Sequence, residues 1–179
     1  THRVTRSNSA LIVVDMQHGF LDEGASLEVP KGRDVIPNIA RLIDACRATN
    51  TPVIFTEFVY ATYIPCLRGD PFGPEHLPSD ANQHTGFGFP SNNCLIGPNA
   101  GDGTESAETI GDLAPGEDEL VIRAHTYDKF YSTHLDLALR SREVNRLMIT
   151  GVTTDVCVNC TLMSAATRNY RVTAVTDGM

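Results

Sequence analysis

The chain has 179 residues, of which 41% are hydrophobic and 20% are charged. This length and composition predict one globular domain with a sizeable core, and they exclude a disordered or fibrous protein. The net charge of -8 and the absence of any dense Lys/Arg stretch argue against nucleic acid as a partner, because such binding depends mainly on neutralising phosphates.

The N-terminal region and the cysteines indicate a cytoplasmic protein without a membrane partner. Residues 1–9 are polar, and the apolar run 10–14 is too short for a signal peptide or a membrane span. The cysteine count is odd, which suits a reducing compartment better than a disulfide framework. The five cysteines are Cys46, Cys66, Cys94, Cys157 and Cys160.

Predicted strands and helices alternate along the chain. The apolar run 11–15, closed by a carboxylate, is typical of a parallel strand buried on both faces. Helical spacing follows over 34–50, and a second strand covers 52–56. The later predicted elements are strand 119–122, helix 133–141, strand 146–150, helix 157–168 and strand 171–175. We therefore expect an α/β fold, a three-layer αβα sandwich with a doubly wound, mainly parallel, Rossmann-like sheet.

One long segment and the C-terminus depart from this alternation. Residues 61–117 are rich in Gly, Pro, Asn, Asp and Ser, with a possible short helix over 107–113. Such a segment usually builds or covers a binding site, although a solvated surface excursion is the alternative. We interpret 1–179 as a single domain that lacks the C-terminal helix expected after its fifth strand, so the native protein should exceed 19.5 kDa.

The ligand of an open α/β sheet binds beyond the carboxyl ends of the strands, where Asp15 and Cys157 are predicted to lie. A cysteine at a helix N-terminus faces unpaired N–H groups and the positive end of the dipole, which favour thiolate and could stabilise an oxyanion. The alternative is a buried structural cysteine, and Cys160, one turn later, fits that description better. Asp15 is either a general base or a turn cap.

Three segments, 11–20, 130–136 and 149–158, resemble signature blocks of the isochorismatase-like cysteine hydrolases, in the right order. The resemblance implies an Asp-Lys-Cys triad with Asp15 as the Asp and Cys157 as the Cys. It also implies a cis peptide before Thr153, whose N–H would join that of Cys157 in an oxyanion hole. Members of the family assemble into dimers or tetramers, so we expect a homodimer or homotetramer.

The lysine of that triad does not carry over. By the family pattern it stands six residues before Phe130, where this chain has Ala124. The favoured explanation is an engineered Lys→Ala substitution that inactivates the chain. The alternatives are a natural pseudoenzyme, or Lys129 supplying the charge from another backbone position. Taken by itself, Lys129 is expected to be a solvated loop residue.

The resemblance implies hydrolysis of a C–N bond in a small linear amide, such as biuret, triuret, ureidoacrylate or another carbamoyl compound, through a thioester on Cys157. The alternatives are a non-catalytic amide-binding pseudoenzyme and a nicotinamidase-like amidase. A Cys-His pair using His18 or His125 is a further catalytic alternative. The predicted substrate contacts are Gln17, Phe20, Tyr127, Phe130 and Asn159, with Arg123 as a possible carboxylate ligand.

No metal or other cofactor is expected. A nicotinamidase relative would carry an Asp-x-His pair and further histidines after the second strand, whereas this chain has Thr56-Glu57-Phe58 there. Only His76 and His84 follow in the loop, and two histidines without a third ligand are more typical of surface residues.

Overall fold

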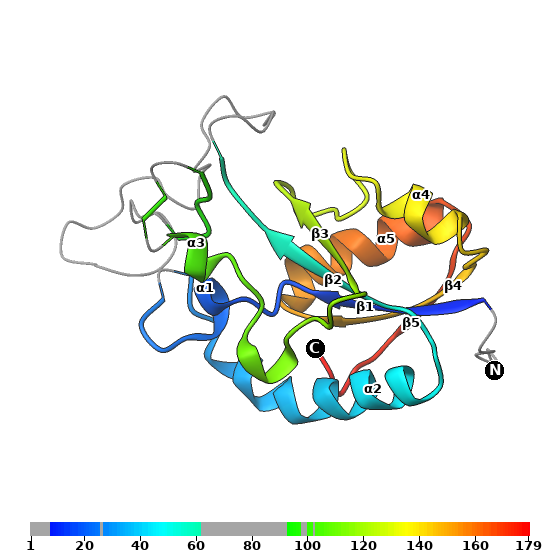
Figure 1. The fold of residues 1–179 in the computed structure, drawn as a ribbon, viewed down its shortest axis with the longest axis horizontal. Helices are drawn as coiled ribbons and strands as arrows, with labels where there is room; N and C mark the ends of the chain where they lie inside the picture. The colour runs from blue at the N-terminus through cyan, green and yellow to red at the C-terminus, as the bar shows by residue number, and fades with distance from the viewer. Residues whose placement is uncertain (1–7, 26, 62–92, 98–99, 102) are drawn as a thin grey trace.

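A computed structural model describes residues 8–25, 27–61, 93–97, 100–101 and 103–179. Its centre is a five-stranded sheet, all parallel, in the order β3-β2-β1-β4-β5 (Figure 1). The strands are β1 (Ser9–Val14), β2 (Val53–Phe58), β3 (Leu120–Ala124), β4 (Arg146–Gly151) and β5 (Arg171–Ala174). The predicted α/β class and parallel sheet are confirmed.

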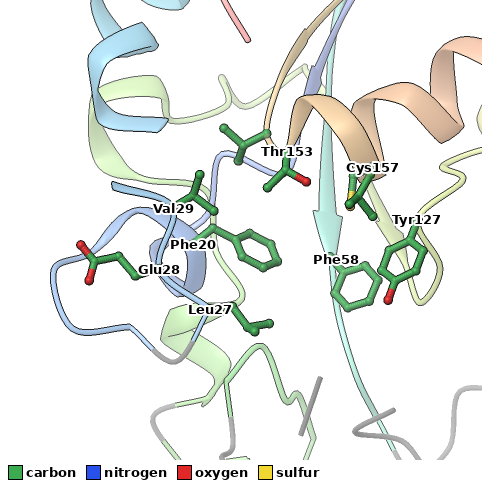
Figure 2. A pocket seen from close by; sticks show the side chains of 10 residues that line it. Phe20, Leu27, Glu28, Val29, Phe58, Tyr127, Thr153 and Cys157 are labelled. Atoms are coloured by element: carbon green, nitrogen blue, oxygen red, sulfur yellow. The ribbon is translucent and has the colours of Figure 1, made fainter. Parts of the chain in front are cut away.

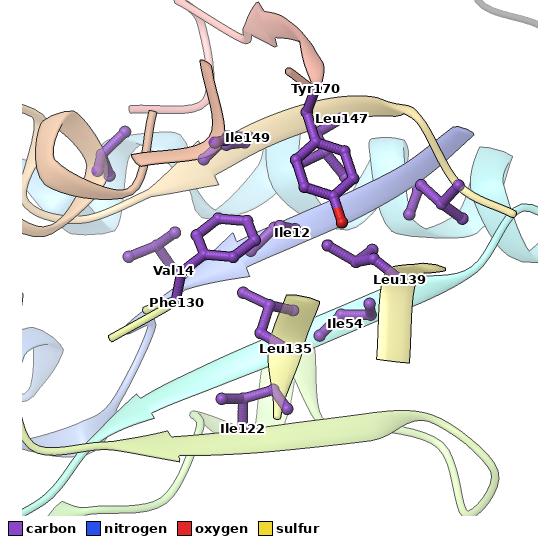
Figure 3. Packing of buried hydrophobic residues seen from close by; sticks show 14 of the residues in the cluster. Ile12, Val14, Ile54, Ile122, Phe130, Leu135, Leu139, Leu147, Ile149 and Tyr170 are labelled. Carbon is purple, nitrogen blue, oxygen red and sulfur yellow. The ribbon is translucent and has the colours of Figure 1, made fainter. Parts of the chain in front are cut away.

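Helices cover both faces of the sheet, because the side chains of each buried strand alternate between two apolar layers. Leu11 and Val13 of β1 pack with α2 (Ile36–Ala48) on one face. Ile12 and Val14 pack on the other face, in a cluster that includes residues of α4 (Leu135–Arg140) and α5 (Asn159–Thr167) (Figure 3). All six residues of β1 are buried, so this strand forms the middle of the core.

The short helical segments lie mostly near the carboxyl ends of the strands. They are α1 (His18–Leu21), η1 (Pro30–Val35), α3 (Gly103–Ser106), η3 (Gly111–Leu113) and the π-helical turn η4 (Thr154–Val158). The predicted helix over 107–113 was wrong over most of its length. Backbone hydrogen bonds there run instead to the segment after β1, from His18 N–H to Glu108 O and from Ile110 N–H to Met16 O. Most of 61–117 lies outside the described residues.

The strand order places a crevice beside β1. The chain passes from β1 to β2 and β3 on one side of the sheet, then returns to β4 and β5 on the other. The connections after β1 and β4 therefore diverge, and the carboxyl ends of these two neighbouring strands are the expected ligand-binding position. In the described part of the chain, no helix has the length and apolar character needed to cross a membrane.

Candidate active site

Asp15 is the first residue after β1 and lies fully buried at the crevice. Its backbone has a φ of 51°, a left-handed conformation that costs free energy for a residue other than glycine. Neighbouring β2 holds it there: the Asp15 N–H donates to Thr56 O at 3.1 Å, and the Thr56 hydroxyl donates to Asp15 Oδ1 at 2.7 Å. The carboxylate is thus fixed at the end of a rigid strand.

Gly151 lets the end of β4 approach β1 closely enough to build the other side of the site. Its φ is 113°, and a Cβ at this position would overlap the carbonyl oxygen of Val14. That oxygen accepts a hydrogen bond from Val152 N–H at 2.9 Å. The Val152–Thr153 peptide is cis, which confirms the conformation implied by the family resemblance.

Cys157 lies buried in η4, near enough to Asp15 and Lys129 for their charges to act on its thiol. Burial raises the pKa of the thiol well above its usual range, the nearby Lys129 ammonium partly opposes this, and Asp15 raises it further. The expectation of a resting thiolate was therefore wrong, because desolvation outweighs the helix N-terminus. A nucleophile at Cys157 needs a base to take its proton, and Asp15 is the carboxylate whose charge acts on the thiol.

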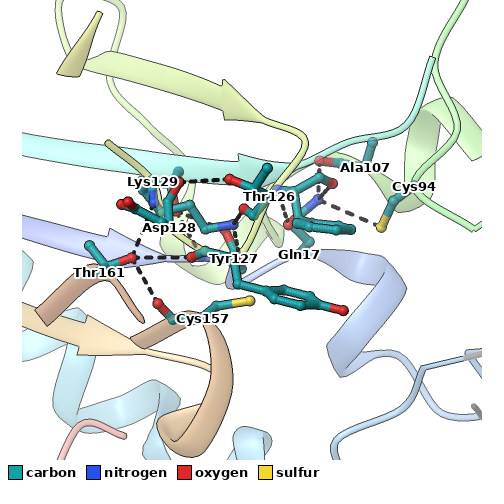
Figure 4. Close-up of polar contacts among 12 residues, drawn as sticks. Gln17, Cys94, Ala107, Thr126, Tyr127, Asp128, Lys129, Cys157 and Thr161 are labelled. Carbon is teal, nitrogen blue, oxygen red and sulfur yellow. Dashed lines mark hydrogen bonds and ion pairs between the residues drawn. The ribbon is translucent and has the colours of Figure 1, made fainter. Parts of the chain in front are cut away.

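Lys129 was expected in solvent, and this expectation was wrong: its side chain is 0% exposed. The ammonium lies 2.7 Å from Asp15 Oδ2 and donates to Thr126 O at 3.1 Å (Figure 4). It also lies 4.8 Å from the centre of the Phe58 ring. A buried charge is tolerated when it is paired and hydrogen-bonded in this way.

Ala124, the position at which the family pattern has lysine, is the buried last residue of β3. It pairs with Phe58 of β2, and its carbonyl oxygen accepts a hydrogen bond from Val59 N–H at 2.9 Å. Its methyl group carries no charge to the site. Among the described residues, the cation that pairs with Asp15 is Lys129.

A pocket of about 470 Å³ opens beside Cys157 (Figure 2). Phe58 forms part of its wall and stacks on Tyr127, with ring centres 5.8 Å apart and planes inclined by 10°. Glu28 is its charged lining residue among those described, and it forms an ion pair with Arg33 at 2.7 Å. The full described lining is Phe20, Leu27, Glu28, Val29, Phe58, Tyr127, Val152, Thr153, Val156 and Cys157.

The five predicted substrate contacts occupy different environments. Phe20 and Tyr127 line the pocket. Phe130 packs in the core against Tyr170, and Asn159 is exposed on α5. The buried Gln17 amide donates to Phe58 O and Ala107 O and accepts from Phe58 N–H, so its hydrogen bonds join three segments of the backbone.

Two of the other polar candidates, His18 and Arg123, are paired with carboxylates. His18 Nδ1 lies 2.9 Å from Asp22 Oδ2, and the pKa of His125 is lowered by burial and by Lys129. Arg123 donates to Glu57 Oε2 at 3.1 Å, while Glu57 Oε1 accepts from Thr109 N–H.

No group of three or more His, Cys, Asp or Glu side chains suited to a metal ion occurs among the residues that the structure describes. The two loop histidines considered as ligands, His76 and His84, lie outside those residues.

Several residues around Cys157 carried no signal that set them apart in the sequence. Lys129 is one residue away from a recognised block, and this proximity was the available clue. Phe58 ends β2, two residues beyond the predicted strand 52–56, whereas Leu27 and Val29 belong to a loop of ordinary composition. These residues line the pocket because the chain folds back to the crevice. Local sequence does not predict such a return.

The site can be compared with known proteins. The isochorismatase domain model matches residues 9–179. The ureidoacrylate amidohydrolase RutB of Variovorax paradoxus (strain S110) is 33% identical over 170 residues, and the match covers 92% of this chain and 65% of that protein. A protein of Arabidopsis thaliana described as a probable inactive nicotinamidase is 29% identical, over 95% of this chain and 79% of its own length.

A similar architecture occurs in a cysteine hydrolase from Pseudomonas syringae pv. phaseolicola 1448A. That structure aligns with a TM-score of 0.72 and 25% identity, covering 98% of this chain and 73% of the other. This chain spans just under two thirds of the Variovorax relative. Since the domain model extends from residue 9 to residue 179, the chain belongs to the isochorismatase domain family.

Proposed function

We propose that this chain is a cysteine amidohydrolase that cleaves a C–N bond of a small linear amide through a thioester on Cys157. The candidate substrates are biuret, triuret, ureidoacrylate and other carbamoyl compounds. The observation that carries the proposal is the buried ion pair of Asp15 and Lys129, 2.7 Å apart, next to the Cys157 thiol and its apolar pocket. The 33% identity to a ureidoacrylate amidohydrolase supports the same chemistry.

The proposed reaction has two halves. As Cys157 Sγ attacks the carbonyl carbon, its proton passes to Asp15, and Asp15 then protonates the departing nitrogen as the C–N bond breaks. Water next attacks the thioester, gives a proton to Asp15, and the C–S bond breaks to release the acid. That proton returns to the sulfur, so the enzyme is regenerated without any net change.

The oxyanion of each tetrahedral intermediate would be stabilised by the N–H groups of Thr153 and Cys157. Both residues line the pocket and belong to the turn that leaves β4. Donors held by a buried strand and a helix start are preorganised, which is the property that makes such a site effective.

The pocket favours an uncharged substrate within the proposed class. Its walls are mainly aromatic and aliphatic, and the charge of Glu28 is compensated by Arg33. Arg123, the predicted carboxylate ligand, is paired with Glu57 instead. A carboxylate would be desolvated here without a cation among the described lining residues, so we expect neutral carbamoyl compounds to react faster than ureidoacrylate.

Ammonia release from a panel of amides tests the proposal. The panel contains biuret, triuret, ureidoacrylate, a neutral N-alkylurea and nicotinamide. We expect turnover that Cys157→Ala abolishes and that the matched variant Cys160→Ala retains. Equal activity in the Cys157→Ala variant would contradict the proposal, and nicotinamide as the best substrate would favour the nicotinamidase-like alternative.

Ala124 motivates the second candidate function, a pseudoenzyme that binds a small amide without hydrolysing it. Under that hypothesis the chain lacks an essential cation, whether by engineering or naturally. Saturable amide binding without ammonia release, measured by calorimetry, would favour it. Assembly as a homodimer or homotetramer is part of the proposal and is measurable by light scattering.

A further inference from the structure

We propose that Lys129 takes over the electrostatic role of the lysine that the family pattern places at position 124, so that the chain is not disarmed by Ala124. This inference rests on the proposed function. It makes Lys129 a positioning residue that acts on substrate through Asp15, from a turn five residues further along the chain.

The groups that surround Lys129 Nζ are suited to a buried ammonium. An ammonium group has three N–H donors. Around Nζ lie Asp15 Oδ2 at 2.7 Å, Thr126 O at 3.1 Å and the face of the Phe58 ring at 4.8 Å. With a side chain that is 0% exposed, this arrangement holds the ammonium without water.

Lys129 and position 124 border the same side chain, although they belong to different segments. Ala124 pairs in register with Phe58 across β2 and β3, and the Lys129 ammonium lies over the Phe58 ring. Lys129 belongs to the turn that follows β3. Its ammonium therefore lies in the region of position 124, at the end of that strand. Ala124, which is buried, contributes only a methyl group to that region.

The turn that carries Lys129 is fastened to the helix that follows Cys157. The Lys129 N–H donates to Thr161 Oγ1 at 3.4 Å, and Thr161 Oγ1 donates to Cys157 O at 2.7 Å. The neighbouring Asp128 accepts from the Ser164 hydroxyl at 2.7 Å. Lysine and nucleophile are therefore held on one rigid unit, as a preorganised site requires.

The Lys129 ammonium lies 2.7 Å from Asp15 Oδ2 and compensates the negative charge of this buried carboxylate. Without a neighbouring cation, a buried carboxyl group favours the neutral form, which cannot take the thiol proton. The charged or titratable groups around this pair are Cys157, Cys94 and, on the Lys129 side, His125. Among these described side chains, Lys129 is the ammonium paired with Asp15.

The experiment uses Lys129→Met, with Lys31→Met as the matched exposed control, on whichever amide the wild-type chain hydrolyses fastest. We expect kcat/KM at pH 7 to fall by at least about 100-fold in Lys129→Met, within the range of general-base effects, and to be unchanged in Lys31→Met. The acidic limb of the pH profile should move to higher pH. A merely structural residue would lower activity evenly across the pH range.

Exchanging the residues at positions 124 and 129 gives an independent test. This test stays informative even if Lys129→Ala alone lowers the stability of the protein. Ala124→Lys alone should not gain activity, since two ammonium groups would compete for one carboxylate. Ala124→Lys combined with Lys129→Ala should recover at least about tenfold over Lys129→Ala. Propylamine should also partly restore Lys129→Ala, whereas trimethylamine should not.

The outcomes separate this inference from the proposed function. Hydrolysis that needs Cys157 but persists in Lys129→Met overturns the inference and leaves the function standing. An inactive wild-type chain that Ala124→Lys activates also overturns it, and supports the disarmed interpretation. A chain with no amidase activity in either form overturns both.

Discussion

The ionisation of the Cys157 thiol depends on its burial and on the negative charge of the nearby Asp15 carboxylate. Burial and the nearby negative charge of Asp15 raise the pKa of the thiol, which favours its protonated form. In the proposed mechanism, this thiol becomes a nucleophile as its proton moves to Asp15. The proposed mechanism therefore depends on a neighbouring base that takes the thiol proton, rather than on a preformed thiolate.

Asp15→Asn should separate the ionisation of Cys157 from catalysis. Asp15 raises the pKa of the thiol through its charge and its hydrogen bond, and Lys129 lowers it. Removing the carboxylate therefore lowers the pKa, so more thiolate is present at a given pH. We expect iodoacetamide to label Cys157 faster than in the wild-type chain at a given pH, while amide hydrolysis falls by at least about 100-fold.

Peptide mass spectrometry of Cys157 across pH 6–10 measures the labelling, with Asp22→Asn as the exposed control. Labelling and hydrolysis that decline together in Asp15→Asn would show that Asp15 serves only to hold the fold. The same single change thus tests the base role without assuming a particular substrate.

Among the elements, the junction of β1 and β4 does most to position the site. Asp15 leaves one strand and the Thr153 turn leaves the other, and the contact between Val152 N–H and Val14 O holds the two exits together. Gly151 permits this approach because it has no side chain. A small residue at one strand end therefore controls the distance between the segments that carry Asp15 and Cys157.

Gly151→Ala should disrupt that junction. The added Cβ would overlap the backbone of Val14, and the φ of 113° is unfavourable for alanine. We expect the free energy of unfolding to fall by at least about 2 kcal/mol. Gly111→Ala, where a Cβ meets nothing within 4 Å, should change it by less than about 0.5 kcal/mol.

Chemical denaturation of the two variants gives this comparison directly. A Gly151→Ala protein with wild-type stability would mean that β1 and β4 separate without cost, and that the close approach is not needed for folding. Activity measured on the same samples reports whether Asp15 and Cys157 still meet.

At the scale of the whole molecule, two apolar layers meet at β1, the strand that carries Asp15. Ile12 is 0% exposed and faces the α4 and α5 layer, whereas Leu137 of α4 is 71% exposed. Ile12→Ala should cost about 2–5 kcal/mol of unfolding free energy, since it leaves a cavity in the core. Leu137→Ala should cost less than about 0.5 kcal/mol, and equal effects in thermal unfolding would contradict this layered core.

The sequence alone determined the alternating elements, the parallel sheet, and the strand ends where Asp15 and Cys157 lie. These features follow from hydrophobic periodicity and from the rule that parallel strands end at one edge, and both are local or topological. The helix predicted over 107–113 failed because its backbone groups bond to the segment after β1, a partner remote in sequence.

Tertiary structure decided which lysine forms an ion pair with Asp15, and in which direction the pKa of Cys157 shifts. Lys129 looks like a loop residue in the sequence, and it is buried because its turn folds back onto Phe58 and α5. The pKa of the thiol is raised because surrounding segments exclude water, and this effect outweighs that of the helix N-terminus. Desolvation and ion pairing arise from the contacts of distant segments, so these two properties depend on the folded chain.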